Sequence, residues 1–267
     1  MPLRVVSWNL FHGRDFPPDP SLFTWRSRLL RTTERDAAHQ QVNRDLLDEF
    51  ANLLAARAWD VALLQECPPR FAAGLAATTG AQGHRVLTAR NWLLPLTSAI
   101  ARRNPDLIAS WEGGSNLTLV RREAIAERRA FVLRRRPERR VMALTRLESG
   151  LCVANLHAST TEHDPVADVR RAADAAVSFA GPRPLVFGGD LNLRPDTTGL
   201  YEELARRHGL AAPTAPDVID HLLVRGLGVL EAPRREPPAD REVDAGGLAI
   251  RLSDHAILDA TFELEAG

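Results

Sequence analysis

Residues 151–192 read LCVANLHASTTEHDPVADVRRAADAAVSFAGPRPLVFGGDLN. This stretch predicts a strand, a helix and a second strand, with polar residues near the end of each strand. Leu151–Leu156 and Pro184–Gly188 are short apolar runs of the kind that form buried strands. Asp164–Ala180, between them, is predicted to be a helix, with Asp164 as the N-cap before a proline. Polar side chains follow each predicted strand directly.

The same patterns extend in both directions along the chain. Further strands are predicted at Leu3–Asn9, Asp60–Gln65, Asn116–Val120, Ala130–Leu133, Val141–Leu147, Val218–Val224 and Ala256–Phe262. Helices are expected in a pattern that runs to about Arg57 and over 71–77 and 200–208, and a surface loop over Ala232–Gly247. Because helices and strands mix and several strand pairs have only short turns between them, we predict one α+β domain over residues 1–267, built as a mixed, layered sandwich.

Composition excludes several classes of protein. Of the 267 residues, 45% are hydrophobic and 25% are charged, which is ordinary for a globular chain and unlike a disordered or collagenous one. No apolar run is long enough to span a membrane. The formal net charge of +0 argues against a nucleic-acid-binding protein that is basic over its whole surface, but it does not exclude a local basic patch. All 34 basic side chains are arginines, which excludes lysine Schiff-base chemistry.

Cysteine content and the N-terminus bear on the cellular compartment. Cys67 and Cys152 are isolated in the sequence and are expected to be small buried residues rather than a disulfide or zinc site. The N-terminal residues enter a predicted strand at once and lack the pattern of a secretory signal. We therefore expect a cytoplasmic protein, and we expect it to be a monomer.

Acidic, amide and imidazole side chains recur at or just after the predicted strands: Asn9, Glu66, Asn155, His157, Asp190, Asn192, Asp220, Asp254 and His255. Strand ends on one edge of a sandwich can converge in space, and functional sites favour such rims. Each residue alone has a structural explanation as a turn cap, a solvated strand end, an ion pair or a buried histidine. The set as a whole favours a functional site.

Six motifs carry a more specific signal: SWN, LLQE, NLH, GGDLN, IDHLLV and SDH. In this order and approximate spacing, over residues 5–258, the chain resembles the endonuclease/exonuclease/phosphatase superfamily. Residues 155–192 are especially similar to the branch of pancreatic-type deoxyribonucleases. The resemblance implies a deoxyribonuclease-like fold of two packed mixed β-sheets flanked by helices. It also implies hydrolysis of phosphate esters with Mg²⁺ or Mn²⁺, ions that prefer hard oxygen ligands.

The resemblance also implies roles for individual residues. Glu66 would be the principal metal ligand, with Asn9 and Asp254 completing the set. Asp190 would orient or deprotonate the attacking water. Asn192 would hold a phosphate oxygen that does not bridge to the leaving group.

Two histidines and one aspartate complete the implied catalytic set. Asp220 would hydrogen-bond His255 and hold it protonated toward the phosphate. His157 would be a second imidazole facing the phosphate, acting as an acid or as an electrostatic clamp. A buried structural pair is the alternative explanation for Asp220 and His255.

Substrate contacts are expected from three further residues: Asn116, Asn155 and Arg140. Asn116 lies near where pancreatic-type deoxyribonucleases place a glutamate that pairs with their first histidine. Asn155 could instead brace the loop under His157. Arg140 is expected to contact the substrate because nucleases of the family place an arginine near the strand predicted at Val141–Leu147.

Arginines and tryptophans give two weaker signals. Nine arginines against three glutamates lie between Arg121 and Arg140, an excess that could follow a nucleic-acid backbone. Alternating exposed faces of hairpin strands explain the same run equally well. Among the tryptophans, core positions are expected for Trp8, Trp59 and Trp111, and substrate contact for Trp25 and Trp92.

Together, these features predict a metal-dependent phosphoester hydrolase, first of all a phosphodiesterase or endonuclease acting on DNA or RNA. One alternative is a phosphatase or phospholipase-type phosphodiesterase that acts on a small-molecule or lipid phosphoester. Another is a non-catalytic binding module on the same scaffold, against which the complete polar set argues. The segments expected to set specificity, roughly 13–42, 80–114 and 193–216, are the ones that least resemble other members of the family, so the sequence does not name the substrate.

Overall fold

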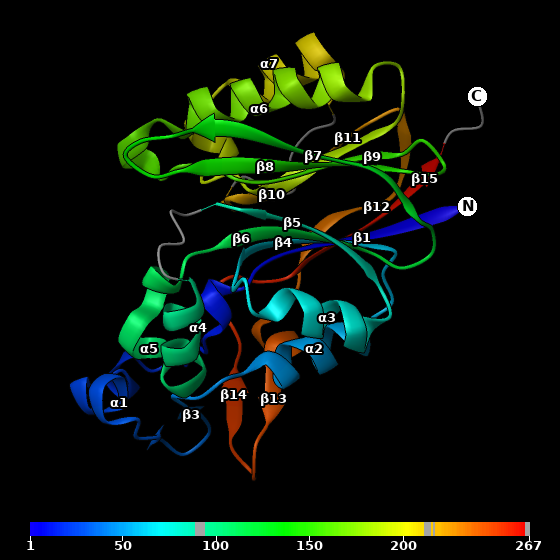
Figure 1. The fold of residues 1–267 in the computed structure, drawn as a ribbon. Helices are drawn as coiled ribbons and strands as arrows, with labels where there is room; N and C mark the ends of the chain where they lie inside the picture. Colours follow the sequence, from blue (N-terminus) through cyan, green and yellow to red (C-terminus); the bar gives the residue numbers. More distant parts are fainter. Residues whose placement is uncertain (89–93, 211–214, 216, 265–267) are drawn as a thin grey trace.

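The computed structural model describes residues 1–88, 94–210, 215 and 217–264, and it consists of two β-sheets packed face to face (Figure 1). The larger sheet contains, in spatial order, β12 (Leu227–Arg235), β15 (Leu258–Leu264), β1 (Pro2–Asn9), β4 (Val61–Cys67), β6 (Ser115–Val120) and β5 (Gln82–Leu87). The smaller sheet contains β11 (Asp220–Arg225), β10 (Leu185–Asp190), β9 (Cys152–His157), β8 (Arg140–Leu147) and β7 (Ile125–Arg134).

Helices cover both outer faces of this sandwich (Figure 1). The smaller sheet carries α6 (Pro165–Ala180) and α7 (Leu200–His208), and the larger sheet carries α2 (Leu47–Ala55) and α3 (Phe71–Thr79). Each sheet contains one parallel pair, β1 with β4 and β9 with β10, among antiparallel neighbours. The prediction of two packed mixed sheets flanked by helices is therefore confirmed.

Apolar side chains fill three layers of the sandwich. Between the sheets, β-branched residues such as Val5, Val61, Val153 and Val186 are fully buried. Outside the smaller sheet, α6 presents a stripe of buried alanines, whose small side chains let the helix approach the strands closely. Each large apolar side chain that is fully buried contributes about 1.5–3 kcal/mol to stability, so these layers hold the strand ends in place.

The start of α6 agrees with its prediction from sequence. The Asp164 carboxylate accepts a hydrogen bond from the backbone N–H of Ala167 at 3.0 Å, and Pro165 occupies the first helical position. The cap satisfies one of the backbone donors that a helix start leaves free. This fixes the direction in which α6 leaves the loop after β9.

The predicted helix running to about Arg57 is wrong in part. That region contains the short helix α1 (Trp25–Leu30), which ends where Arg31 adopts a left-handed backbone, and then two two-residue strands, β2 (Glu34–Arg35) and β3 (Gln40–Gln41). The helical prediction therefore holds for α1 and α2 and is wrong for the residues between them. The polar residues before α2 offer no apolar stripe to bury, so tertiary contacts decide their conformation.

The predicted loop at Ala232–Gly247 is also wrong in part. It contains the end of β12, a 3₁₀ helix (Pro238–Arg241) and β13 (Glu242–Asp244), which pairs with β14 (Ala249–Arg251). Two register shifts mark the pairing of β12 with β15. An edge strand tolerates proline and such irregularities because one side of its backbone needs no partner strand.

Within the described residues, no helix is both long enough and apolar enough to cross a membrane.

Candidate active site

Strand register places three of the candidate residues side by side in the smaller sheet. Asp190, at the end of β10, lies opposite His157 of β9 on one side and opposite Asp220 of β11 on the other. Residues directly opposite each other on neighbouring strands point to the same face of a sheet. The three side chains therefore come together, although their positions in the sequence span more than sixty residues.

Two glycines before Asp190 are required by the backbone. Gly189 has a φ of +128°, and a Cβ at this position would lie 2.0 Å from the carbonyl oxygen of Leu156. A Cβ on Gly188 would lie 2.3 Å from the carbonyl oxygen of His221. Both neighbouring strands thus approach β10 more closely than a side chain permits. This close approach brings His157 and Asp220 within reach of Asp190.

The Asp190 carboxylate is buried and held at both oxygens. Its Oδ2 accepts a hydrogen bond from Nδ2 of Asn9 at 2.9 Å, and its Oδ1 accepts one from the backbone N–H of Asn192 at 3.1 Å. Two imidazole nitrogens lie nearby, Nε2 of His157 at 3.5 Å and Nε2 of His255 at 3.8 Å from Oδ2. Burial raises the pKa of Asp190 above its ordinary value, which makes it a better proton acceptor.

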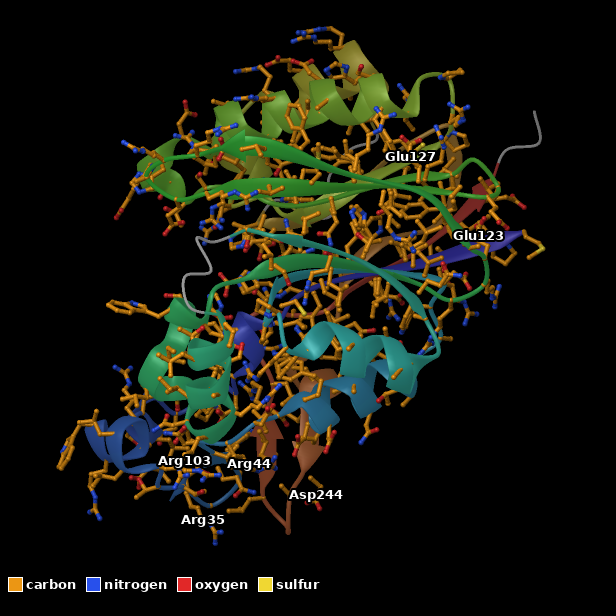
Figure 2. All side chains as sticks on the ribbon, viewed as in Figure 1. Arg35, Arg44, Arg103, Glu123, Glu127 and Asp244 are labelled. Carbon is orange, nitrogen blue, oxygen red and sulfur yellow. The ribbon has the colours of Figure 1, made fainter. Side chains whose placement is uncertain are left out.

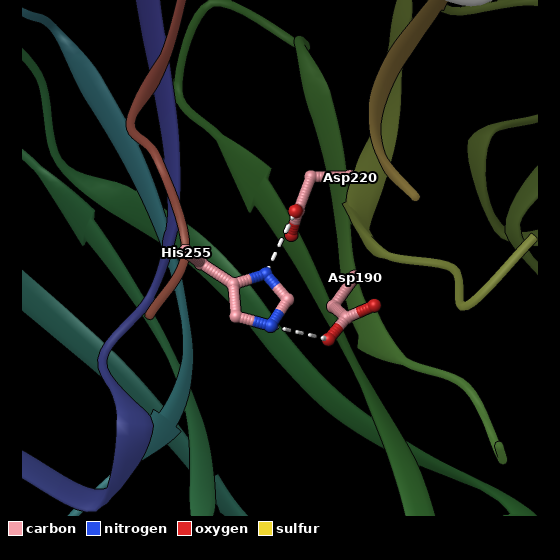
Figure 3. A group of neighbouring side chains, drawn as sticks. All are labelled: Asp190, Asp220 and His255. Atoms are coloured by element: carbon pink, nitrogen blue, oxygen red, sulfur yellow. Dashed lines mark hydrogen bonds and ion pairs between the residues drawn. The ribbon is translucent and has the colours of Figure 1, made fainter. Parts of the chain in front are cut away.

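His255 is paired with Asp220 as predicted from the sequence (Figure 3). Nδ1 of the imidazole lies 2.8 Å from Oδ2 of Asp220, and Nε2 points toward Asp190. Burial alone would lower the pKa of His255, but the carboxylates around it, Asp220 foremost, raise this pKa to about 10. The ring is therefore an imidazolium with one N–H fixed on Asp220 and the other free to face a substrate.

His157 has a different charge from the one expected. The side chain is buried, and burial lowers the pKa of His157 to about 3 despite the attraction of Asp190. The ring is neutral near pH 7, so it offers one N–H donor rather than the positive charge of a clamp. Its Nδ1 lies 3.8 Å from Oε1 of Glu66, which links the two sheets at the site.

Glu66 lies near the end of β4, where the pairing with β6 is irregular, and has a left-handed backbone with a φ of +46°. Its Oε2 lies 3.3 Å from Nε2 of His12, a residue in the 3₁₀ turn Phe11–Gly13. The sequence analysis did not select His12. The available signal was an imidazole three residues after Asn9, within the loop that follows a predicted strand end.

A divalent cation fits the acidic residues at this edge. Oδ1 of Asp254 is buried with no hydrogen-bond partner among the described residues. Burial and then the negative charge of Glu66 raise the pKa of Asp254, although the positive charge of His255 opposes them. A buried Asp254 carboxylate with a raised pKa and an oxygen without a partner are features that a bound Mg²⁺ or Mn²⁺ would relieve. Asn9 contributes less clearly, since its Oδ1 already accepts the backbone N–H of Phe11 at 3.0 Å.

A second group, Asp190, Asp220 and His255, also has possible metal-ligating atoms within 4.8 Å of one another. To bind a metal, Nε2 of His255 would have to lose its proton, whereas the surrounding carboxylates, Asp220 foremost, raise the pKa of this ring to about 10 against the effect of burial. This group is therefore better suited to holding and moving protons than to holding a metal.

The site residues surround a cavity of about 430 Å³. Its wall includes His12, Glu66, His157, Asp190, Asn192, His255 and Arg140. Nη2 of Arg140 lies 2.6 Å from Oε2 of Glu138, and its Nε is buried without a partner among the described residues. Asp254 lines a smaller cavity of about 250 Å³ on the other side of His255, together with Asp220.

Asn155 and Asn116 lie outside the cavity wall. Both side chains are fully buried. Asn155 joins the two sheets, because its Oδ1 accepts a hydrogen bond from Nε2 of Gln65 at 2.8 Å and its Nδ2 donates to the carbonyl oxygen of Leu64. Nδ2 of Asn116 donates to the carbonyl oxygen of Val141 at 2.8 Å. Of the three expected substrate contacts, only Arg140 borders the cavity.

Most arginines of the stretch from Arg121 to Arg140 have partners within the protein. Arg121 stacks 3.8 Å above the ring of Trp59, Arg122 pairs with Asp60 at 2.7 Å, and Arg134 pairs with Asp168 at 3.1 Å. Ion pairs or backbone bonds also engage Arg129, Arg139 and Arg140. The structural explanation accounts for these six of the nine arginines.

The tryptophans are distributed differently from the expectation in one case. Trp8 and Trp59 are buried as predicted, but Trp111 is 83% exposed, so its expected place in the core is wrong. It lies in a 3₁₀ turn (Ala109–Glu112) that leads into β6. Ser110 and Gly114, on either side of it in the chain, line the cavity, whereas Trp111 does not. Trp25 is exposed, and Trp92 lies outside the described residues.

Comparisons with known proteins agree with this geometry. The family model described as "Endonuclease/Exonuclease/phosphatase family" matches residues 6–255. An endonuclease/exonuclease/phosphatase family protein from Bacteroides thetaiotaomicron has a similar structure, with a TM-score of 0.63, 14% identity, and coverage of 98% of this chain and 97% of that one. No match to a curated protein sequence was found.

Two further solved structures share the fold. Truncated TDP2 from Caenorhabditis elegans has a TM-score of 0.58 and 16% identity, with 98% of each chain covered. A mannosyl-6-phosphatase from Bacteroides thetaiotaomicron has a TM-score of 0.58 and 15% identity, with 97% of this chain and 99% of that chain covered. At these identities the likeness extends to the fold and does not assign a substrate.

Proposed function

Because this chain belongs to the endonuclease/exonuclease/phosphatase family, whose members are phosphoester hydrolases, we propose that it is a divalent-metal-dependent phosphodiesterase. The arrangement around Asp190 supports this proposal most strongly. One buried carboxylate, held by Asn9, has the imidazole of His157 on one side and the Asp220–His255 pair on the other. A proton acceptor and a proton donor thus border the same cavity.

The residues of the chain have separable tasks in this proposal. Asp190 orients a water molecule and accepts its proton as the water attacks phosphorus. His255, fixed by Asp220, donates a hydrogen bond to a phosphoryl oxygen as negative charge develops there. His157 and Asn192 offer further donors to the phosphate. Glu66 and Asp254 would hold Mg²⁺ or Mn²⁺, which would polarise the phosphoryl oxygen and lower the pKa of bound water.

The charge of the cavity wall favours a diester over a monoester. A phosphodiester carries one negative charge, whereas a phosphomonoester carries close to two near neutral pH. The wall contains the imidazolium of His255 and two arginines, Arg139 and Arg140, against three acidic side chains, Glu66, Glu138 and Asp190. These charges nearly offset one another. Nucleic acid is the first substrate class to test, followed by lipid and small-molecule phosphodiesters.

A substrate panel with defined metal content tests the proposal. Metal-stripped protein would be assayed on bis-p-nitrophenyl phosphate, p-nitrophenyl phosphate, single- and double-stranded DNA, RNA, a sugar 6-phosphate and a phospholipid, each with EDTA, Mg²⁺ or Mn²⁺. We expect EDTA to abolish hydrolysis, either metal to restore it, and diesters to be cleaved faster than monoesters. Full activity in the stripped sample, or a clear preference for monoesters, would overturn the proposal.

A further inference from the structure

Exposed apolar side chains are concentrated in one part of the molecule. Ten large apolar residues are exposed in the described chain, and six of them belong to three short helices and the turn that follows: Trp25, Leu29, Leu30, Leu96, Leu107 and Trp111. These elements are α1, α4 (Leu94–Arg103), α5 (Pro105–Ile108) and the 3₁₀ turn Ala109–Glu112. They form a lobe at the end of the sandwich away from both chain termini (Figure 1). We call this surface the helical-lobe face.

Two adjoining grooves show that four of these side chains, Trp25, Leu29, Leu30 and Leu107, form one surface. Leu29, Leu30, Ile100 and Leu107 line a groove of about 580 Å³ between α1 and α4–α5. Leu29 and Leu107 also line a second groove of about 400 Å³, together with Trp25. Leu29 is 58% exposed and Leu107 is 53% exposed, so the two leucines join the grooves while remaining open to solvent. Continuous apolar surface of this kind marks an interaction site.

Basic side chains surround the same face. Arg26, Arg28, Arg31, Arg102 and Arg103 are exposed, and none forms an ion pair with a described residue; Figure 2 labels Arg103 within the lobe. The acidic residue between them, Asp106, is bound to Arg14 at 3.4 Å and to Gln41 at 2.8 Å, and the charge of Arg28 also acts on it. Arg26, Arg31, Arg102 and Arg103 have no acidic partner among the described residues. Elsewhere, most arginines of the Arg121–Arg140 stretch have partners. The helical-lobe face therefore combines open apolar surface with uncompensated positive charge.

From this combination we infer that the helical-lobe face docks onto an anionic membrane surface. Leucine and tryptophan side chains enter the boundary between headgroups and acyl chains, and arginines around them bind anionic lipid headgroups. Tryptophan in particular favours that boundary, because its ring is apolar and its N–H is polar. No segment has to cross the bilayer for such binding.

Two other binding partners, a second copy of the chain and a nucleic acid, explain fewer features of the helical-lobe face than a membrane does. A second copy of the chain, packed through the same face around a two-fold axis, would bring unpaired arginines opposite one another. A nucleic acid would satisfy the arginines, but it would leave four exposed leucines unexplained. An anionic bilayer satisfies both parts of the face at once.

The chain connects this face directly to the candidate active site. Leu107 belongs to the face, and Ser110, three residues later, lines the catalytic cavity. Docking would hold the mouth of the cavity near the headgroup layer. This inference rests on the proposed phosphodiesterase function. If the protein docks in this way, the phosphodiesters within reach of the cavity are those of phospholipids.

Vesicle binding tests the inference without using catalysis. Asp190→Asn protein would be sedimented with vesicles of phosphatidylcholine alone and with vesicles that contain about 30% phosphatidylserine. We expect binding only to the anionic vesicles. Leu29→Ser/Leu107→Ser and Arg31→Glu/Arg103→Glu, each placed in the Asp190→Asn background, should each weaken binding at least about tenfold. Leu230→Ser and Arg206→Glu, exposed changes elsewhere on the molecule, should leave it unchanged.

Contrary results are distinct from one another. Absence of binding to anionic vesicles overturns the inference, as does binding that survives the double leucine change. A concentration-dependent dimer that the leucine changes dissociate would assign the face to a second copy. DNA binding lost only in the arginine variant would assign it to nucleic acid. Melting temperatures establish that every variant folds. The leucine and arginine variants, made without Asp190→Asn, should hydrolyse bis-p-nitrophenyl phosphate at the wild-type rate. A failure of membrane docking can therefore be distinguished from a failure of the proposed chemistry.

Discussion

Nδ2 of Asn9 donates a hydrogen bond to Oδ2 of Asp190 at 2.9 Å, and this bond crosses between the two sheets of the sandwich. Asn9 ends β1 in the larger sheet, and Asp190 ends β10 in the smaller one. Below it, Gln65 and Asn155 make a second hydrogen bond across the same interface at 2.8 Å. The relative position of the sheets therefore determines the position of the proposed proton acceptor.

Asp190→Asn should lower turnover of bis-p-nitrophenyl phosphate by roughly 10² to 10⁴, since the change removes the proton acceptor and keeps the shape. Stability should fall only modestly: burial already raises the pKa of this carboxyl and disfavours its charge, but the new amide NH₂ cannot accept one of the two hydrogen bonds that the carboxylate accepts. Turnover and thermal melts would be measured on the same preparations. Asp196→Asn, an exposed change six residues along, is the control and should retain full activity. Near wild-type turnover in Asp190→Asn would show that the proposed role is wrong.

Asn9→Ala distinguishes a metal ligand from a residue that positions Asp190. Because both polar atoms of the Asn9 side chain already have partners, we expect kcat to fall at least about tenfold while the half-saturating Mg²⁺ concentration stays unchanged. A titration of activity with Mg²⁺ measures both quantities, with exposed Asn52→Ala as the control. A large rise in the half-saturating Mg²⁺ concentration would instead support Asn9 as a ligand.

Glu66→Gln should weaken metal binding, because it removes the negative charge expected to hold the cation beside Asp254. The half-saturating Mn²⁺ concentration should rise about 10- to 100-fold, a range typical when support for a metal site is lost. Direct Mn²⁺ titration by calorimetry gives a readout that does not depend on turnover. The exposed change Glu162→Gln should bind Mn²⁺ like the wild type. Equal affinity in Glu66→Gln would place the metal elsewhere.

His84 should make stability depend on pH in the acid range. Burial between the sheets lowers the pKa of His84 from 6.5 to about 4, and its Nδ1 lies 2.8 Å from Oγ1 of Thr145. Between these values the unfolded chain binds the proton and the folded chain does not, so stability rises with pH. The contribution is complete above pH 6.5 and is lost as pH falls toward 4, by at most about 3 kcal/mol.

Denaturant unfolding of the wild type and of His84→Gln at a series of pH values measures this effect. The pH slope between pH 4.5 and 6.5 should be smaller in the variant. At pH 7.5 both side chains are uncharged, so the difference there reports packing alone. Identical slopes would show that His84 does not contribute to the acid sensitivity.

Arg135→Gln/Arg136→Gln tests the basic stretch. These arginines are exposed and have no ion-pair partner among the described residues, whereas Arg134 pairs with Asp168. We expect DNA binding, if measurable, to keep the salt dependence of the wild type, because most charges in the stretch are engaged within the protein. A decrease of about two in the slope of log K against log salt would show that these side chains contact phosphates.

The sequence determined more of the fold in its second half than in its first. Apolar runs such as Leu151–Leu156 are short, bounded by turn residues and buried, so local pattern and tertiary structure agree there. The segment from Arg31 to Asp45 is polar and irregular, and packing against other elements decides its two short strands. Trp111 shows the same limit, because composition favours burial of a large aromatic ring and only the lobe leaves it exposed.

By itself, the sequence determined the residue types of the site and their places near the ends of predicted strands: Asp190 after two glycines, His157 after one strand, Glu66 after another, and Asp220 near the start of a third. Only the tertiary structure decided how they meet. Parallel and antiparallel register sets Asp190 between His157 and Asp220, and sheet packing brings His12 and Glu66 to the cavity that Asp190 lines and Asn9 into hydrogen-bond contact with Asp190. It also decided that His157 is neutral and His255 charged, because a pKa depends on burial and on neighbouring carboxylates, which only the packing of the sheets supplies.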